Sequence, residues 1–289
     1  MPVRPSAGTT AAARDRRISQ ELVALAVLTV AATAWLMLFL GHDVTGHGGT
    51  HAPADGRIAL PTADGSHAHH GHGTAAPSPA LIGGVLAVGG WTLMVVAMML
   101  PPALPLLQTV HRLVSRQPDP WRLTVLSTIV FVGAWTLVGV AVVAGDVGLR
   151  ALLGRIWPDT DPRWAAAGVL VLAGIYQFTP LKDLCLRGCR SPRSFVLAHW
   201  QGRRSTSAEV VSLSGAYALS CIGCCWALML ICFAIGAAAL PAMVALALVM
   251  AAERLVPWGR RLVRPSGLVL IVLGAATALT AAAPALPFP

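Results

Sequence analysis

Charged side chains are scarce in this chain of 289 residues. They make up 11% of the sequence, whereas apolar residues make up 56%. Soluble domains carry about 25% charged residues, so this composition excludes an ordinary soluble fold and indicates an integral membrane protein. Lys182 is the single lysine among the 21 basic residues, which is typical of GC-rich, bacterial coding. The net charge of +9 then reflects membrane topology, and we expect no nucleic-acid partner.

Several kinds of functional group are also missing. The apolar stretches contain no histidine, which argues against a bis-His haem between helices. They hold no paired carboxylates, no Ser/His/Asp set and no phosphate-binding loop, so we expect neither a hydrolase nor an ATPase, and no enzyme activity is predicted. The long loops lack cysteine, because all six cysteines fall between residues 185 and 232. A secreted disulfide framework is therefore not expected.

The apolar residues gather in stretches long enough to cross a bilayer. A membrane-spanning helix needs about 20 such residues. The first stretch is longer than the apolar core of a signal peptide, so we expect it to be retained as an anchor. The sequence therefore predicts an all-α, polytopic transmembrane helical bundle of about seven spans. The candidate spans are residues 22–41, 81–107, 123–145, 164–181, 209–235, 240–256 and 266–284.

The distribution of basic residues predicts the orientation. Of the 21 basic residues, 17 fall in residues 1–21 and in alternate connections after them, and only Arg57, Arg150, Arg155 and Arg163 fall in the others. Because basic residues accumulate on the cytoplasmic side, the N-terminus is expected inside, in a multi-pass protein of the plasma (inner) membrane. The predicted parts are a basic arm (1–21), an anchor (22–41), an outer loop (42–80) and a six-span bundle with a Cys/Met site (81–284).

The outer loop 42–80 is rich in His, Gly, Pro and Ala and is expected to be disordered. It contains the cluster His67, His69, His70 and His72. Neutral imidazole binds copper, zinc and nickel, so this loop could collect metal ions outside the membrane. An equally good interpretation is a solvated linker in which the histidines have no function.

The fifth predicted span carries four of the six cysteines. Cys221, Cys225, Met229 and Cys232 recur at helical spacing and form one stripe, with Cys224 beside it. A stripe of soft sulfur that faces other helices could hold a soft metal ion or perform thiol chemistry.

Two further cysteines follow the fourth predicted span. Cys185 and Cys189 share one face if the helix persists past Pro180. Lys182 lies close to membrane depth and is expected to face the bundle, where Glu253 is a candidate partner. The capping box Thr206-Ser-Ala-Glu209 predicts where the fifth helix starts, and Cys221 lies about 22 Å along the axis from it. One compact site and two sites at different depths therefore both fit the spacing.

The second predicted span presents Met94 and Met98 on the same face as Trp91 and Pro101. Methionine is most often core filler, but thioether sulfur also suits Cu(I). We take Met94 and Met98 as auxiliary ligands, with Met229, because of the cysteines elsewhere in the chain.

Four motifs give the chain a resemblance to a bacterial family of predicted metal-binding integral membrane proteins of unknown function. The resemblance covers about residues 85–275 and implies a metal site built from the cysteines. Tyr217-Ala218 and Ala238-Ala239 depart from the His-Gly and Met-Asn expected of that family. The motifs are Trp91-x-x-Met94-x-x-x-Met98-Met99-x-Pro101, Tyr176-Gln-x-Thr-Pro180-Leu-Lys182-x-x-Cys185-x-x-x-Cys189-Arg190-x-Pro192, Cys221-x-Gly223-Cys224-Cys225-Trp226-x-Leu-Met229 and Glu253-Arg-x-x-Pro257-x-Gly259.

Three functions compete on this basis. The favoured one is a membrane metal-handling protein that binds, transfers or exports Cu(I), because mixed thiolate and thioether ligands suit copper better than zinc. Zinc or another soft metal is the alternative ion, and a metal chaperone or metalloprotein client is the expected partner besides the lipid bilayer.

The second function is a transmembrane thiol–disulfide relay through Cys221/Cys224 and Cys185/Cys189. The third is a scaffold subunit without its own chemistry. The predicted metal ligands are Cys185, Cys189, Cys221, Cys224, Cys225, Met94, Met98 and Met229.

Overall fold

The computed structural model describes residues 7–46, 79–156, 161–202, 204–235 and 240–282. Within these ranges every regular element is a helix, which confirms the all-α prediction. The helices are α1 (Ala7–Gly46), α2 (Pro79–Leu113), α3 (Pro120–Ile156), α4 (Pro162–Tyr176), α5 (Pro180–Arg190), α6 (Pro192–His199), α7 (Thr206–Ile235), α8 (Leu240–Leu255), the short 3₁₀ helix η2 (Gly259–Leu262) and α9 (Val263–Ala282).

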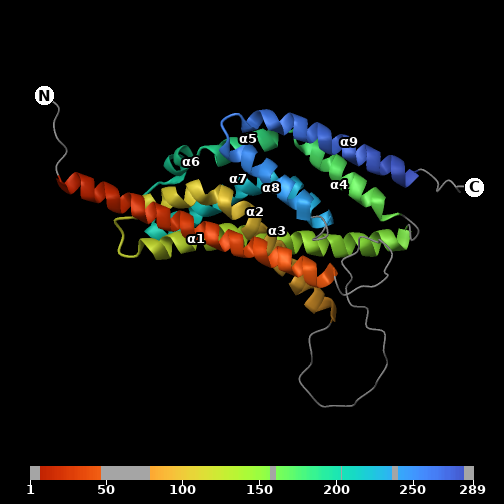
Figure 1. Ribbon diagram of the computed structural model, residues 1–289, viewed down its shortest axis with the longest axis horizontal. Helices are drawn as coiled ribbons and strands as arrows, with labels where there is room; N and C mark the ends of the chain where they lie inside the picture. Colours follow the sequence, from red (N-terminus) through yellow and green to blue (C-terminus); the bar gives the residue numbers. More distant parts are fainter. Residues whose placement is uncertain (1–6, 47–78, 157–160, 203, 236–239, 283–289) are drawn as a thin grey trace, which may run out of the picture.

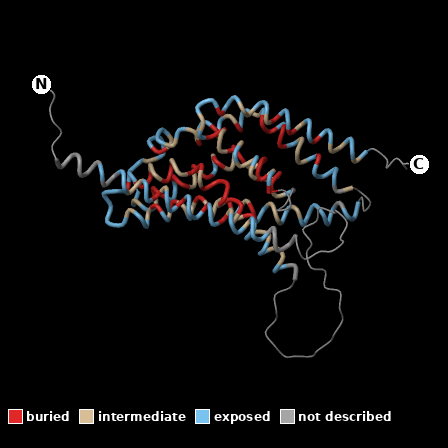
Figure 2. Tube along the Cα trace, viewed as in Figure 1, coloured by how far each residue is buried: buried red, intermediate tan, exposed pale blue. Residues whose placement is uncertain are grey.

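The helices form a bundle with α7 at its centre. α7 packs against α3, α4, α5 and α8, while α1 packs against α2 and α9 against α4. Figure 1 shows α1, α2 and α3 along one side of the molecule and α4 and α9 along the other, with α7 and α8 between them. Buried residues concentrate in this middle region, as Figure 2 shows. The outward faces of α1, α3 and α9 expose leucine and valine.

Within the described ranges, five helical stretches are long and apolar enough to cross a membrane, and α4 with α5 would make a sixth as one bent span. The helix α8 has 16 residues, fewer than the roughly 20 that a span needs. The described residues therefore support a polytopic architecture with several spans. The total of seven and the inside position of the N-terminus stay predictions.

The fourth predicted span is interrupted. A helix that continues through residue 180 would need an N–H that proline lacks. Instead α4 ends at Tyr176, Thr179 accepts a hydrogen bond from the Lys182 backbone N–H, and α5 starts at Pro180 after a bend of 68°. The helix therefore does not continue straight past Pro180, but Cys185 and Cys189 still share one helix, α5.

The prolines within α2 leave backbone carbonyls without their helical partners. Pro101 cannot donate to the carbonyl of Ala97, and the indole N–H of Trp35 on α1 donates to this oxygen at 3.1 Å. A neighbouring helix therefore satisfies the polar group that the proline frees, as membrane-depth helices require.

Two details at the helix ends differ from the sequence-based expectation. The cap of α7 is Ser205, whose hydroxyl accepts from the Ala208 N–H at 3.4 Å, so the predicted capping box that starts at Thr206 is wrong. His111 lies beyond the predicted span 81–107, yet it is buried in α2, with its Nδ1 2.9 Å from the Thr124 hydroxyl.

Close packing of α4 on α9 depends on glycine. A Cβ at Gly267 would lie 2.7 Å from Gln177 Cβ and 3.0 Å from the Gly174 carbonyl oxygen. Backbone cannot move aside cheaply, so a side chain at Gly267 would push the two helices apart. This contact matters for the rest of the fold, because α4 also packs against α7.

We predict that Gly267→Ala lowers the free energy of unfolding by about 1–3 kcal/mol, the usual cost of overpacking. Gly168→Ala on α4 is the matched control, since a Cβ there meets nothing within 4 Å, and alanine is the better helix former. Thermal unfolding of both variants in the same detergent measures the difference. Equal midpoints for the two variants would contradict the close packing.

Candidate metal centre

Three cysteine sulfurs meet in the interior of the bundle. The Sγ atoms of Cys189, Cys221 and Cys224 all lie within 4.8 Å of one another, and Cys189 Sγ is 3.7 Å from Cys224 Sγ. Each of the three residues is buried. We call these residues the cysteine trio. Cys225 adjoins it, because its sulfur is 3.2 Å from that of Cys224.

The trio exists because α5 turns away from α4. The bend at Gln177–Thr179 directs α5 against α7, and the two helices pack along their length. Cys221 and Cys224 are one helical turn apart on α7, so both sulfurs can face Cys189 on α5. The spacing in the sequence fitted either one compact site or two sites at different depths. In the structure Cys189 lies with the cysteines of α7 in one cluster.

The spacing of the trio fits a thiolate-bound metal ion. A metal–sulfur bond is about 2.3 Å long, so three sulfurs around one ion would be roughly 4 Å apart. The trio already lies within 4.8 Å. An all-sulfur set of ligands favours soft ions, among them Cu(I) and zinc.

Cys185 lies beside the trio without belonging to it. It is the one cysteine of the six that is only partly buried. A Cβ at Gly223 would clash with Cys185 Sγ, so this sulfur lies against the α7 backbone next to Cys224. The glycine is what allows α5 to come this close to α7.

The predicted methionines are all in the core, and a further methionine, Met99, contacts Arg254. Met94, Met98 and Met229 are buried in the same hydrophobic cluster as the trio. The sulfur of Met99 instead lies 4.0 Å from Arg254 Nη1, which also contacts Cys221. The sequence analysis did not place Met99 on the helical face of Met94 and Met98. Its position beside Arg254 follows from the packing of α2 against α8.

Arg254 is the residue that sequence reasoning missed most clearly. Counted above as part of a cytoplasmic connection, its side chain is in fact only 3% exposed. Its Nη1 lies 3.2 Å from Cys221 Sγ, and its Nη2 donates to the Tyr217 hydroxyl at 3.2 Å. A cation beside a sulfur stabilises the thiolate, which is the form that binds metals. Its place in the Glu253-Arg motif was the only signal in the sequence.

An ion pair lies next to these residues. Lys182 Nζ is 2.7 Å from Glu253 Oε2, and both side chains are 1% exposed. Ser266 donates a further hydrogen bond to Glu253 Oε1 at 3.2 Å. Of the partners that the sequence left open for Glu253, the structure therefore shows Lys182, and the pair joins α5 to α8.

Arg190 provides a second connection between the same helices. It follows Cys189 directly and donates to the backbone carbonyls of Glu253, Val256 and Pro257. These carbonyls belong to the last turn of α8 and to the two residues that follow it, where helices leave oxygens without partners. Cys189 is therefore held between two cross-helix contacts of α5.

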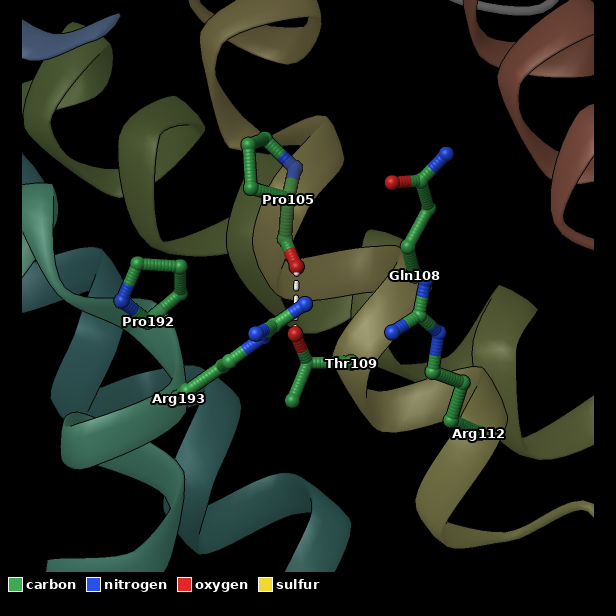
Figure 3. A pocket seen from close by; sticks show the side chains of 6 residues that line it. All are labelled: Pro105, Gln108, Thr109, Arg112, Pro192 and Arg193. Atoms are coloured by element: carbon green, nitrogen blue, oxygen red, sulfur yellow. Dashed lines mark hydrogen bonds between the residues drawn. The ribbon is translucent and has the colours of Figure 1, made fainter. Parts of the chain in front are cut away.

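A surface pocket between α2 and α6 is not the metal centre. Figure 3 shows Arg193 of α6 facing Thr109 and Arg112 of α2 across it. Its lining contains no sulfur and no histidine, and consists of Pro105, Gln108, Thr109, Arg112, Pro192 and Arg193. The predicted metal-collecting residues His67, His69, His70 and His72 lie outside the described residues.

These observations define an all-helical protein with several apolar helices of spanning length and a buried cysteine centre. A family model described as "PpoB2: Copper chaperone" matches residues 88–277, more than half of the sequence. The chain belongs to this copper chaperone family. The matched region contains the trio and Arg254, and it agrees with the metal-related family expected from the motifs. Searches of the curated proteins and of the solved structures found no match.

Proposed function

We propose that this protein is an integral membrane copper chaperone that binds Cu(I) at Cys189, Cys221 and Cys224 and passes it to a metalloprotein client. The observation that carries the proposal is the trio itself, three buried sulfurs from two helices within 4.8 Å. Family membership supports copper as the ion. The apolar helices support a location in the membrane, and the distribution of basic residues supports an N-terminus on the inside.

The chemistry of the trio supports the reduced ion. Cu(I) is soft and prefers thiolate and thioether sulfur. Each cysteine releases its proton when it binds the metal. The sulfur of Cys225 lies 3.2 Å from that of Cys224 and could take the ion as it leaves the trio. Met94, Met98, Met229 and Cys185 then belong to the surroundings of the site, and the histidines of residues 67–72 would collect copper outside.

Burial of the sulfurs makes the thiol–disulfide relay a poorer explanation. Cys221, Cys224 and Cys225 are each at most 1% exposed, and disulfide exchange needs a thiolate that a partner can reach. Metal transfer can begin inside the bundle, by a ligand exchange from the trio to Cys225, whose sulfur is 3.2 Å from that of Cys224. The scaffold hypothesis gives no reason for three sulfurs to converge beside a buried arginine.

X-ray absorption at the copper edge tests the proposal on the wild-type protein. The full chain is purified in detergent under reducing conditions, loaded with Cu(I) and desalted. We expect one Cu(I) ion per chain with two or three sulfur neighbours at about 2.3 Å, as for other metal–thiolate bonds. Protein that retains no copper, or copper bound only by nitrogen and oxygen, would refute it.

A further inference from the structure

Arg254 is a buried cation without an acidic partner. Among the described residues no carboxylate lies within 4.0 Å of its guanidinium, and the adjacent Glu253 is paired with Lys182. Its contacts are the sulfurs of Cys221 and Met99 and the hydroxyl of Tyr217. Its Nε has no acceptor within the same described ranges. Burying an uncompensated charge is costly, so this arrangement needs an explanation.

The loaded copper site would supply the missing negative charge. Cysteines that hold a metal are thiolates, so one Cu(I) ion bound by two or three of them forms a complex with a net charge of −1 or −2. In an apolar interior such a complex is itself unfavourable unless a cation offsets it. Arg254 is the cation in contact with a sulfur of the trio.

The contacts of Arg254 also reach the second helix of the site. Arg254 donates to the Tyr217 hydroxyl, and this hydroxyl donates to the backbone carbonyl of Cys189 at 3.1 Å. One side chain of α8 thus connects Cys221 on α7 directly and Cys189 on α5 through Tyr217. A displacement of the guanidinium would disturb both arms of the trio.

We propose, on the basis of the function proposed above, that Arg254 is the positioning and charge-balancing residue of the copper site. It orients Cys221 Sγ toward the sulfurs of Cys189 and Cys224, and it offsets the negative charge of the copper–thiolate complex. Its place inside the core is therefore a requirement of the loaded site and not of the fold. The metal-free protein has no need of it.

The test compares wild type, Arg254→Met and Arg254→Lys as full chains in detergent. Cu(I) affinity is measured by competition with bathocuproine disulfonate, and thermal unfolding is measured without metal. Loss of a residue that supports a metal ligand costs about 10–100-fold in affinity, and we expect this loss for Arg254→Met. We expect Arg254→Lys to recover part of it, and the metal-free Arg254→Met protein to unfold no earlier than wild type.

A double-mutant cycle identifies the ligand through which Arg254 acts. In a Cys221→Ser background, Arg254→Met should cause little further loss, because interacting residues are not additive. Wild-type affinity in Arg254→Met would overturn the inference, and so would an affinity loss that is equal in the Lys variant and accompanied by earlier unfolding. Wild-type protein that binds no Cu(I) would instead refute the proposed function.

Discussion

Replacing Cys224 by Ser is expected to reduce copper in the purified protein from one ion per chain to near zero. Cys224 Sγ lies 3.7 Å from Cys189 Sγ and 3.2 Å from Cys225 Sγ. A hydroxyl is a hard ligand and a poor replacement for thiolate on Cu(I). Changes to the partners of metal ligands already cost about 10–100-fold in affinity, and removing a ligand costs more.

The measurement is elemental analysis of the full chain after loading with Cu(I) under reducing conditions and desalting. Cys232→Ser is the matched control, because Cys232 is also buried in α7 but lies about 12 Å along the axis from Cys224. The control should keep its copper. If both single variants lose copper equally, or if copper also survives in Cys224→Ser/Cys225→Ser, the trio is not the binding site. Copper that survives in Cys224→Ser and disappears in Cys224→Ser/Cys225→Ser would identify Cys225 as a substitute ligand.

Lys182→Met is expected to destabilise the metal-free protein by about 3–5 kcal/mol, the usual cost of breaking a buried ion pair. The change leaves Glu253 charged and removes the Lys182 Nζ that lies 2.7 Å from its Oε2. The Glu253 side chain is only 1% exposed, so water cannot replace this partner. Ser266 provides one neutral hydrogen bond, which cannot replace the lost charge. The free energy of unfolding in a denaturing-detergent titration measures the effect.

The double variant Lys182→Met/Glu253→Leu separates charge from packing. Replacing both partners of a buried pair by apolar side chains is often neutral or stabilising, so the double variant should be more stable than Lys182→Met alone. Arg187→Met is the control on the same helix, because the pair of Arg187 with Asp183 is exposed and exposed pairs contribute about 0–1 kcal/mol. A single Lys182→Met variant as stable as Arg187→Met would show that the pair does not hold α5 to α8.

The candidate site was accessible from the sequence only in part. The stripe of cysteines on α7 was visible because helical spacing is a local property, and Cys185 and Cys189 stood out by composition. Arg254 was not visible, because an arginine after a glutamate at the end of an apolar run ordinarily means a solvated helix end. Met99 was missed for a related reason, since its neighbours Met94 and Met98 fit the expected face better. Which side chain points at a sulfur depends on how α2 and α8 are rotated in the bundle.

The sequence by itself determined that this protein is helical, apolar and rich in clustered thiols. Those properties follow from composition and from periodicities of a few residues, which no long-range contact can change. The tertiary structure decided that Cys189, rather than Cys185, joins Cys221 and Cys224. It also decided that Lys182 pairs with Glu253 while Arg254 faces the sulfurs. The physical reason is the bend after α4, which sets the direction of α5, and the packing of α5 and α8 on α7, which fixes which side chains can meet.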